Sequence, residues 1–64
     1  MKVKEAIKLI ERDGWILSRQ KGSHRQFKHP YKPGCVTIAG PLSDELDIGT
    51  QYSIFKQAQM MRRR

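Results

Sequence analysis

The sequence predicts an α+β fold in the order α-β-β-β-α, in which two helices cover one face of a three-stranded antiparallel sheet. Amphipathic stretches with helical spacing lie near the two ends of the chain, and three strand-like segments separated by turn residues lie between them. Laying both helices on the same face of an antiparallel meander is the simplest way to bury their apolar sides. The opposite face of the sheet is then free to meet a ligand.

The first helix is expected from Val3 to Asp13. Charged side chains separate the members of an apolar stripe, which consists of Val3, Ala6, Ile7, Leu9 and Ile10. Gly14 follows as a natural end to the helix, because glycine readily adopts the left-handed conformation that is common there. The pattern indicates a helix whose apolar side faces a core.

Two strands are expected next, at Trp15–Lys21 and His24–His29. They are separated by two residues, Gly22 and Ser23, which is the spacing of a tight hairpin, and glycine in the first position favours a type II′ turn. Pro30 ends the second strand, because proline cannot donate a hydrogen bond to a neighbouring strand.

The turn decides which residues face each other across this hairpin. Lys21 and His24 are expected to lie opposite each other at its end, with their side chains on the same face. Regular pairing puts Phe27 on the other face together with Ile16, yet the alternation does not assign either face clearly to the core. A bulge in the hairpin would reconcile the two patterns.

The third strand is expected at Cys35–Ala39, after a turn at Tyr31–Gly34 that has proline and glycine at typical turn positions. Cys35 is expected to be a partly buried residue of this strand. As the only cysteine it cannot form an internal disulfide, and with two histidines it is poorly spaced for a zinc site. We therefore expect a reducing compartment.

The second helix is expected from Ile48 or Thr50 to Met60, with Asp47 or Thr50 as its N-terminal cap. Its apolar stripe consists of Ile54, Phe55, Ala58 and Met61. The last three residues, Arg62–Arg64, form a basic tail.

The 64 residues are expected to form one domain with a small core, and their net charge of +7 is strongly basic. This charge favours a polyanionic partner, which can be RNA, DNA, an anionic membrane or an acidic protein. The sequence contains no bilayer-length apolar run and no signal peptide pattern. We expect a cytoplasmic protein that needs no metal and no small-molecule cofactor and does not bind a membrane.

Six segments of the chain recur in one known family: Gly14-Trp15, Arg19–His24, Phe27–Pro30, Val36–Ile38, Gly49-Thr50 and Ser53–Ala58. In this order they resemble HicA-type toxins of toxin–antitoxin systems, over nearly the whole chain and at a matching length. The resemblance implies a double-stranded-RNA-binding-domain-like fold. It also implies a ribosome-independent mRNA endonuclease, whose essential histidine belongs to a Gly-Ser-His motif, and a HicB-type antitoxin that masks this site. The motif corresponds here to Gly22, Ser23 and His24.

RNA carries its own nucleophile, the 2′-hydroxyl, so a nuclease can cleave it without a metal ion. His24 is the candidate general base or general acid, and His29 is the obvious second candidate. The residues expected to bind RNA are Arg19, Lys21, Gly22, Ser23, Arg25 and Lys28.

Two other readings of the same residues remain open. The first is a non-catalytic module that binds structured RNA through phosphate and 2′-hydroxyl contacts. The second is a protein whose basic face matters mainly because it docks an acidic antitoxin. Cleavage of RNA by the purified chain distinguishes the nuclease from the binding module.

Overall fold

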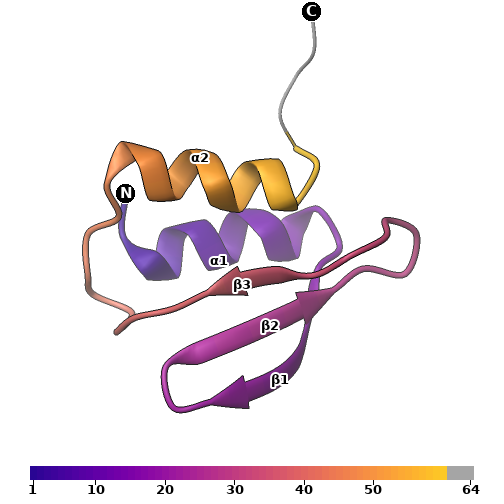
Figure 1. Cartoon of the computed structure of the whole chain (residues 1–64), viewed down its shortest axis with the longest axis horizontal. Coiled ribbons are helices and arrows are strands. Elements are labelled where there is room, and N and C mark those ends of the chain that lie inside the picture. The colour runs from indigo at the N-terminus through magenta and orange to yellow at the C-terminus, as the bar shows by residue number, and fades with distance from the viewer. Residues whose placement is uncertain (61–64) are drawn as a thin grey trace, which may run out of the picture.

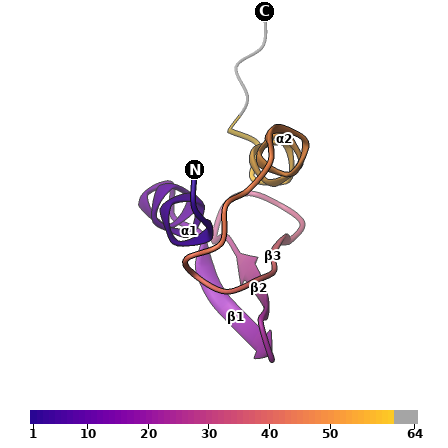
Figure 2. The ribbon, with the colours of Figure 1, turned by 90° about the vertical axis from the view of Figure 1, so that its left-hand side faces the viewer.

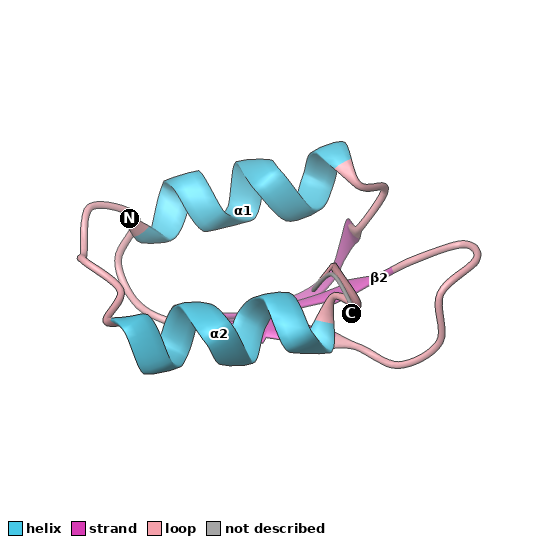
Figure 3. Ribbon diagram, turned by 90° about the horizontal axis from the view of Figure 1, so that it is seen from above, coloured by secondary structure: helices cyan, strands magenta, loops and turns pink. Residues whose placement is uncertain are grey.

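The computed structural model describes residues 1–60 and contains the five predicted elements in the predicted order (Figure 1). The elements are α1 (Val3–Arg12), β1 (Ile16–Lys21), β2 (His24–Lys28), β3 (Val36–Ile38) and α2 (Ile48–Gln57). The strands form one antiparallel sheet in the order β1-β2-β3. Both helices cover the same side of this sheet and lie next to each other, as Figures 2 and 3 show. The predicted α+β fold is therefore confirmed.

Helix α1 ends in a motif that directs the chain into the core. The backbone N–H of Gly14 donates to the carbonyl oxygen of Glu11, and that of Trp15 donates to the carbonyl oxygen of Ile10. This pair of bonds is the Schellman motif, which requires a left-handed residue after the helix, and Gly14 has a φ of +109°. Trp15 is thereby turned inward and is only 1% exposed.

The hairpin of β1 and β2 contains the bulge that the sequence left unplaced. Leu17 pairs with Phe27 and Arg19 pairs with Gln26, so Ser18 is the extra residue. Phe27 thus faces Leu17, and the expectation that Phe27 shares its face with Ile16 was wrong. Because the bulge reverses the alternation along β1, it places Ile16 on the face away from the helices, where this side chain is 63% exposed.

The core lies between the sheet and the helices. Its buried members are Val3, Ala6, Ile10, Trp15, Phe27, Val36, Ile38, Ile54 and Ala58. Trp15 and Phe27, each only 1% exposed, are therefore packing residues. The third strand is shorter than expected and leaves out Cys35, which is exposed and not partly buried as predicted.

Helix α2 begins at the expected cap. The Asp47 carboxylate accepts a hydrogen bond from the backbone N–H of Thr50 at 2.7 Å, and this bond lowers the pKa of Asp47. The helix ends at Gln57, three residues before the predicted end at Met60. Two predicted features, Met61 of the apolar stripe and the basic tail Arg62–Arg64, lie outside the described residues.

Neither helix within residues 1–60 has the length and the apolar character that crossing a bilayer requires.

Candidate active site

The tight turn of the hairpin positions the candidate histidine. Gly22 has a φ of +58° and Ser23 does not have a positive φ, which is the pattern of a type II′ turn. Lys21 and His24 are paired directly across the strands, as predicted from the spacing. Two side chains in such a pair lie on the same face, with their Cβ atoms about 4.5–5.5 Å apart. The turn therefore holds a cation beside His24.

The alternation of β2 divides its side chains between two environments. Phe27 is buried under the helices, so His24, Gln26 and Lys28 lie on the opposite, open face of the sheet. On the neighbouring strands, Arg19 and Thr37 are the pairing partners of Gln26. The open face therefore carries Arg19, Gln26 and Thr37 in a row across the three strands. The Lys21–His24 pair lies next to this row, at the turn.

These residues line a depression of about 480 Å³ on the open face. The lining residues are Arg19, Lys21, His24, Gln26 and Thr37. Two of the five are cations and none is acidic, and Lys28 adds a third cation on the same face. Because no carboxylate lines the depression, its charge favours an anion such as a phosphate group. The imidazole of His24, a group that can accept or donate a proton, stands within this depression.

The structure does not bring Arg25 to this face. Arg25 pairs with Gln20 and with the buried Ile38, so its side chain lies on the helix side of the sheet. Its Nη1 donates to the carbonyl oxygen of Ser23 at 3.2 Å and to that of Gly40 at 3.0 Å. Arg25 therefore connects the hairpin turn to the segment after β3, and its sequence neighbour His24 points the other way.

His29, the second candidate, is also far from the depression, because it follows the opposite end of β2. Its side chain is only 7% exposed. Nδ1 accepts hydrogen bonds from the backbone N–H groups of Tyr31 and Lys32, at 3.0 and 3.2 Å. Nε2 must then carry the proton, and it donates to the carbonyl oxygen of Asp13 at 2.7 Å. These contacts indicate a structural role for His29.

Around His29 lies a cluster that the sequence did not reveal. Lys32 Nζ contacts the Asp13 carboxylate at 2.6 Å and donates to the carbonyl oxygen of Ala58 at 3.2 Å. The ammonium group of Lys32 lowers the pKa of the Asp13 carboxyl. The cluster joins the end of α1, the loop after β2 and the end of α2. No sequence signal could have identified it, because its members are far apart along the chain.

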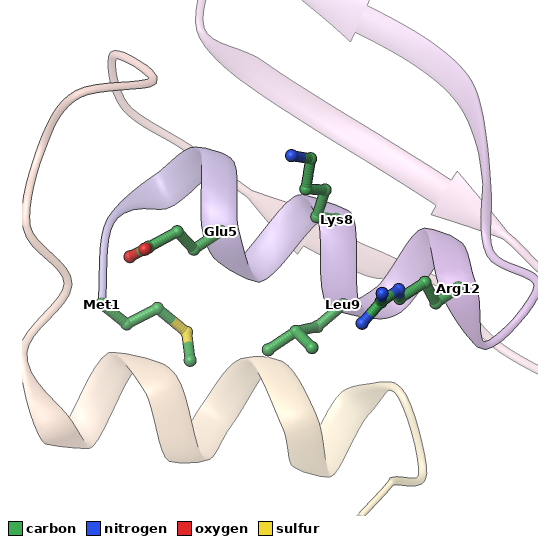
Figure 4. Close-up of a pocket in the computed structure, with 5 residues that line it drawn as sticks. All are labelled: Met1, Glu5, Lys8, Leu9 and Arg12. Carbon is green, nitrogen blue, oxygen red and sulfur yellow. The ribbon is translucent and has the colours of Figure 1, made fainter.

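A second depression, of about 550 Å³, is lined by the N-terminal residue and by side chains of α1 (Figure 4). Its lining residues are Met1, Glu5, Lys8, Leu9 and Arg12. It combines apolar side chains with charges of both signs, and no histidine lines it. The depression around His24 is therefore the better candidate for acid–base chemistry.

Side chains that could ligate a metal do not gather in the described part of the chain. Within residues 1–60, no group of three or more His, Cys, Asp or Glu side chains could hold a metal ion.

The comparison with protein families gives one match that covers most of the chain. A family model described as the HicA toxin of bacterial toxin–antitoxin systems matches residues 3–60. The matched range includes all five elements and every residue that lines the depression around His24. No curated protein matches the chain.

Proposed function

Because the chain belongs to the HicA toxin family of bacterial toxin–antitoxin systems, we propose that it is an endoribonuclease that cleaves mRNA with His24 as its catalytic residue. The observation that carries this proposal is the position of His24 beside Lys21, in a depression without acidic side chains on the open face of the sheet. Such a site can bind a phosphodiester and move a proton next to it. The target is mRNA in the cytoplasm.

The reaction uses the nucleophile of the RNA itself. His24, as general base, takes the proton of a ribose 2′-hydroxyl, and the 2′-oxygen attacks the adjacent phosphorus. The bond from phosphorus to the 5′-oxygen breaks, and the leaving oxygen takes its proton from water, which reaches this exposed site. The products are one strand with a 2′,3′-cyclic phosphate and one strand with a 5′-hydroxyl.

The cations of the open face bind the substrate and stabilise the charge that develops on the phosphorane. Arg19 and Lys21 line the depression itself, and Lys28 follows on the same strand as His24. The backbone N–H groups of Gly22 and Ser23 lie at the exposed turn, where they can donate to the RNA backbone, whereas the two carbonyl oxygens accept from Gln20 and Arg25. The partner of the toxin is an antitoxin, which we propose to be of the HicB type and to neutralise the toxin by covering this face.

The purified chain is expected to cleave mRNA in the presence of excess EDTA, because the proposed reaction uses no metal ion. The measurement is the appearance of RNA fragments together with the chemistry of their ends. Cyclic phosphates and 5′-hydroxyl groups are expected at the new ends. Binding of RNA without cleavage would instead indicate a non-catalytic RNA-binding module, and ends with 5′-phosphates would contradict the role of the 2′-hydroxyl.

Lys21→Ala and Arg25→Ala each remove one positive charge, and they are expected to affect RNA binding differently. Lys21 faces the depression, so its loss should weaken RNA binding and reduce the slope of log K against log salt by about 0.7, the value for one phosphate contact with a single strand. Arg25 lies on the helix side, so its loss should leave the slope unchanged. RNA-binding titrations at several salt concentrations measure both slopes. Equal slopes for the two variants would contradict the proposal that Lys21 contacts RNA and Arg25 does not.

A further inference from the structure

We propose that the backbone N–H group of Ser23 donates a hydrogen bond to a non-bridging oxygen of the scissile phosphate and stabilises the charge that develops there during cleavage. The side chain of Gln20 holds this N–H group in place from the other face of the sheet, which makes Gln20 a positioning residue. The inference rests on the proposed function, because it describes how the same site stabilises the phosphorane.

The first observation is the direction of the peptide group between Gly22 and Ser23. Gln20 pairs with Arg25, so its side chain lies on the helix side of the sheet. Gln20 Nε2 donates to the carbonyl oxygen of Gly22 at 3.0 Å, and this carbonyl therefore points toward the helix side. In a planar trans peptide group the N–H points opposite to the C=O. The N–H of Ser23 is thereby directed toward the open face.

The turn type gives the same direction. With the standard dihedral angles of a type II′ turn, the central carbonyl oxygen lies on the face opposite to the side chains of the two flanking residues. The flanking residues here are Lys21 and His24, whose side chains lie on the open face. The hydrogen bond to Gln20 and the geometry of the turn therefore agree on the orientation of this peptide group.

The second observation is that the N–H of Ser23 is unpaired next to the reacting group. Within residues 1–60 it donates to no acceptor of the protein. Ser23 is adjacent to His24, and the Cα atoms of neighbouring residues are about 3.8 Å apart. The phosphate that a 2′-hydroxyl attacks is linked to the same ribose. When the 2′-hydroxyl reaches His24, an oxygen of that phosphate can therefore reach the N–H of Ser23.

The surroundings select an anionic partner for this N–H group. A backbone N–H can only donate, so its ligand must supply an acceptor. Arg19 and Lys21 line the same depression and no carboxylate does, so a negatively charged acceptor is favoured. In RNA the negative charge lies on the non-bridging phosphate oxygens. A donor that is already fixed in position stabilises the phosphorane more strongly than the ground state, because more charge develops on it.

Gln20 acts on the reaction only through the turn. Its side chain is on the helix side and does not line the depression around His24. Without its hydrogen bond, the peptide group after Gly22 is free to rotate. A peptide group rotated halfway round would turn the N–H of Ser23 away from the open face. Loss of Gln20 should therefore lower kcat, while KM should change little because the cations remain in place.

The sharpest test removes the N–H of Ser23 and no side chain. Chemical synthesis of the 64-residue chain allows the amide nitrogen of Ser23 to be replaced by an ester oxygen. The kcat for RNA cleavage is expected to fall by about 10- to 100-fold, which corresponds to one hydrogen bond to a charged group. An ester protein that cleaves RNA as fast as the wild type overturns the proposal.

The matched control is the same replacement at Ser43, in the segment before α2. In the described part of the chain the N–H of Ser43 also has no acceptor. The carbonyl oxygen of the same peptide group, that of Leu42, accepts one hydrogen bond from the N–H of Lys4 at 3.1 Å. The two peptide groups are therefore alike, and the ester at Ser43 should leave kcat unchanged. An equal loss of kcat in both esters would show a general effect of the ester and overturn the proposal.

Substrates with sulfur at the scissile phosphate identify the oxygen that is bound. Sulfur accepts hydrogen bonds weakly, and each of the two phosphorothioate diastereomers replaces one non-bridging oxygen. For the diastereomer with sulfur in place of the bound oxygen, the ester at Ser23 should cause little further loss of kcat. For the other diastereomer the full loss should remain. Equal losses for both diastereomers overturn the contact.

Gln20→Met tests the positioning role, because it removes the amide and keeps the length of the side chain. It should lower kcat by a smaller factor than the ester at Ser23 and leave KM nearly unchanged. Gln59→Met is the control, because its amide also donates to an exposed backbone carbonyl, that of Pro33, at 2.9 Å. A Gln20→Met protein with the kcat of the wild type, or one that raises KM alone, overturns the role of Gln20.

The contact and the nuclease can fail separately. NMR spectra of the amide protons are recorded while an RNA strand with 2′-fluoro groups, which cannot be cleaved, is added. The amide proton of Ser23 should move downfield, because it enters a hydrogen bond with phosphate. This shift in a chain that never cleaves ordinary RNA supports the contact and refutes the proposed activity. Cleavage by a chain whose Ser23 amide proton does not shift refutes the contact and leaves the activity standing.

Discussion

Replacing His24 with alanine is expected to lower the rate of RNA cleavage by about 10²–10⁴-fold, the usual contribution of a general acid–base group. The fold should remain intact, because the side chain is exposed and no hydrogen bond joins it to the rest of residues 1–60. An exposed position of this kind usually changes the free energy of unfolding by less than about 0.5 kcal/mol. The His24→Ala variant should therefore be a folded protein with little or no RNA-cleaving activity.

The measurement compares kcat/KM of the wild type and of His24→Ala on the same RNA, together with thermal unfolding followed by circular dichroism. RNA affinity should change little, because Arg19, Lys21 and Lys28 remain in place. Equal cleavage by the two proteins would assign the chemistry to another residue. Unfolding of the variant would show that His24 has a structural role.

The sequence was sufficient for the order of the elements and for the Lys21–His24 pair, because both depend on local patterns. Helical spacing, turn residues and the two-residue hairpin are each visible within a few positions of the chain. The bulge at Ser18 was different, because it depends on whether Ile16 or Leu17 turns toward the core with Phe27. That choice is made by packing between distant segments, which a local pattern does not contain.

The same limit explains the residues that sequence reasoning grouped wrongly or missed. Charge alone put Arg25 with the other cations, whereas the alternation along β2 puts it on the helix side, bonded to Gly40. Alternation along β2 could have identified Gln26 as a residue of the depression, because a residue two positions after His24 lies on the same face of the strand. Thr37 could not have been found this way, because its place in the depression depends on the pairing of β2 with β3.

Replacing His29 is expected to lower the stability of the protein, whereas replacing His24 is expected to lower its activity. His29→Ala is expected to lower the free energy of unfolding by about 2–4 kcal/mol, because the change leaves the partly buried backbone groups of Asp13 and Lys32, and the exposed N–H of Tyr31, without their hydrogen-bond partner. The ring also contacts the edge of Trp15, with centroids 5.1 Å apart. A domain of this length is usually stable by only about 3–10 kcal/mol, so this loss removes a substantial part of the stability of the protein.

Denaturant unfolding of His24→Ala and His29→Ala side by side separates a catalytic histidine from a structural one. His29→Asn serves as the intermediate variant, because its side-chain oxygen can still accept from the N–H groups of Tyr31 and Lys32 while the donor to Asp13 is lost. Its stability should lie between those of the wild type and His29→Ala, and the folded fraction should retain the cleavage rate of the wild type. A folded His29→Asn protein that cannot cleave RNA would mean that His29 takes part in the reaction, although it lies at the opposite end of β2 from His24.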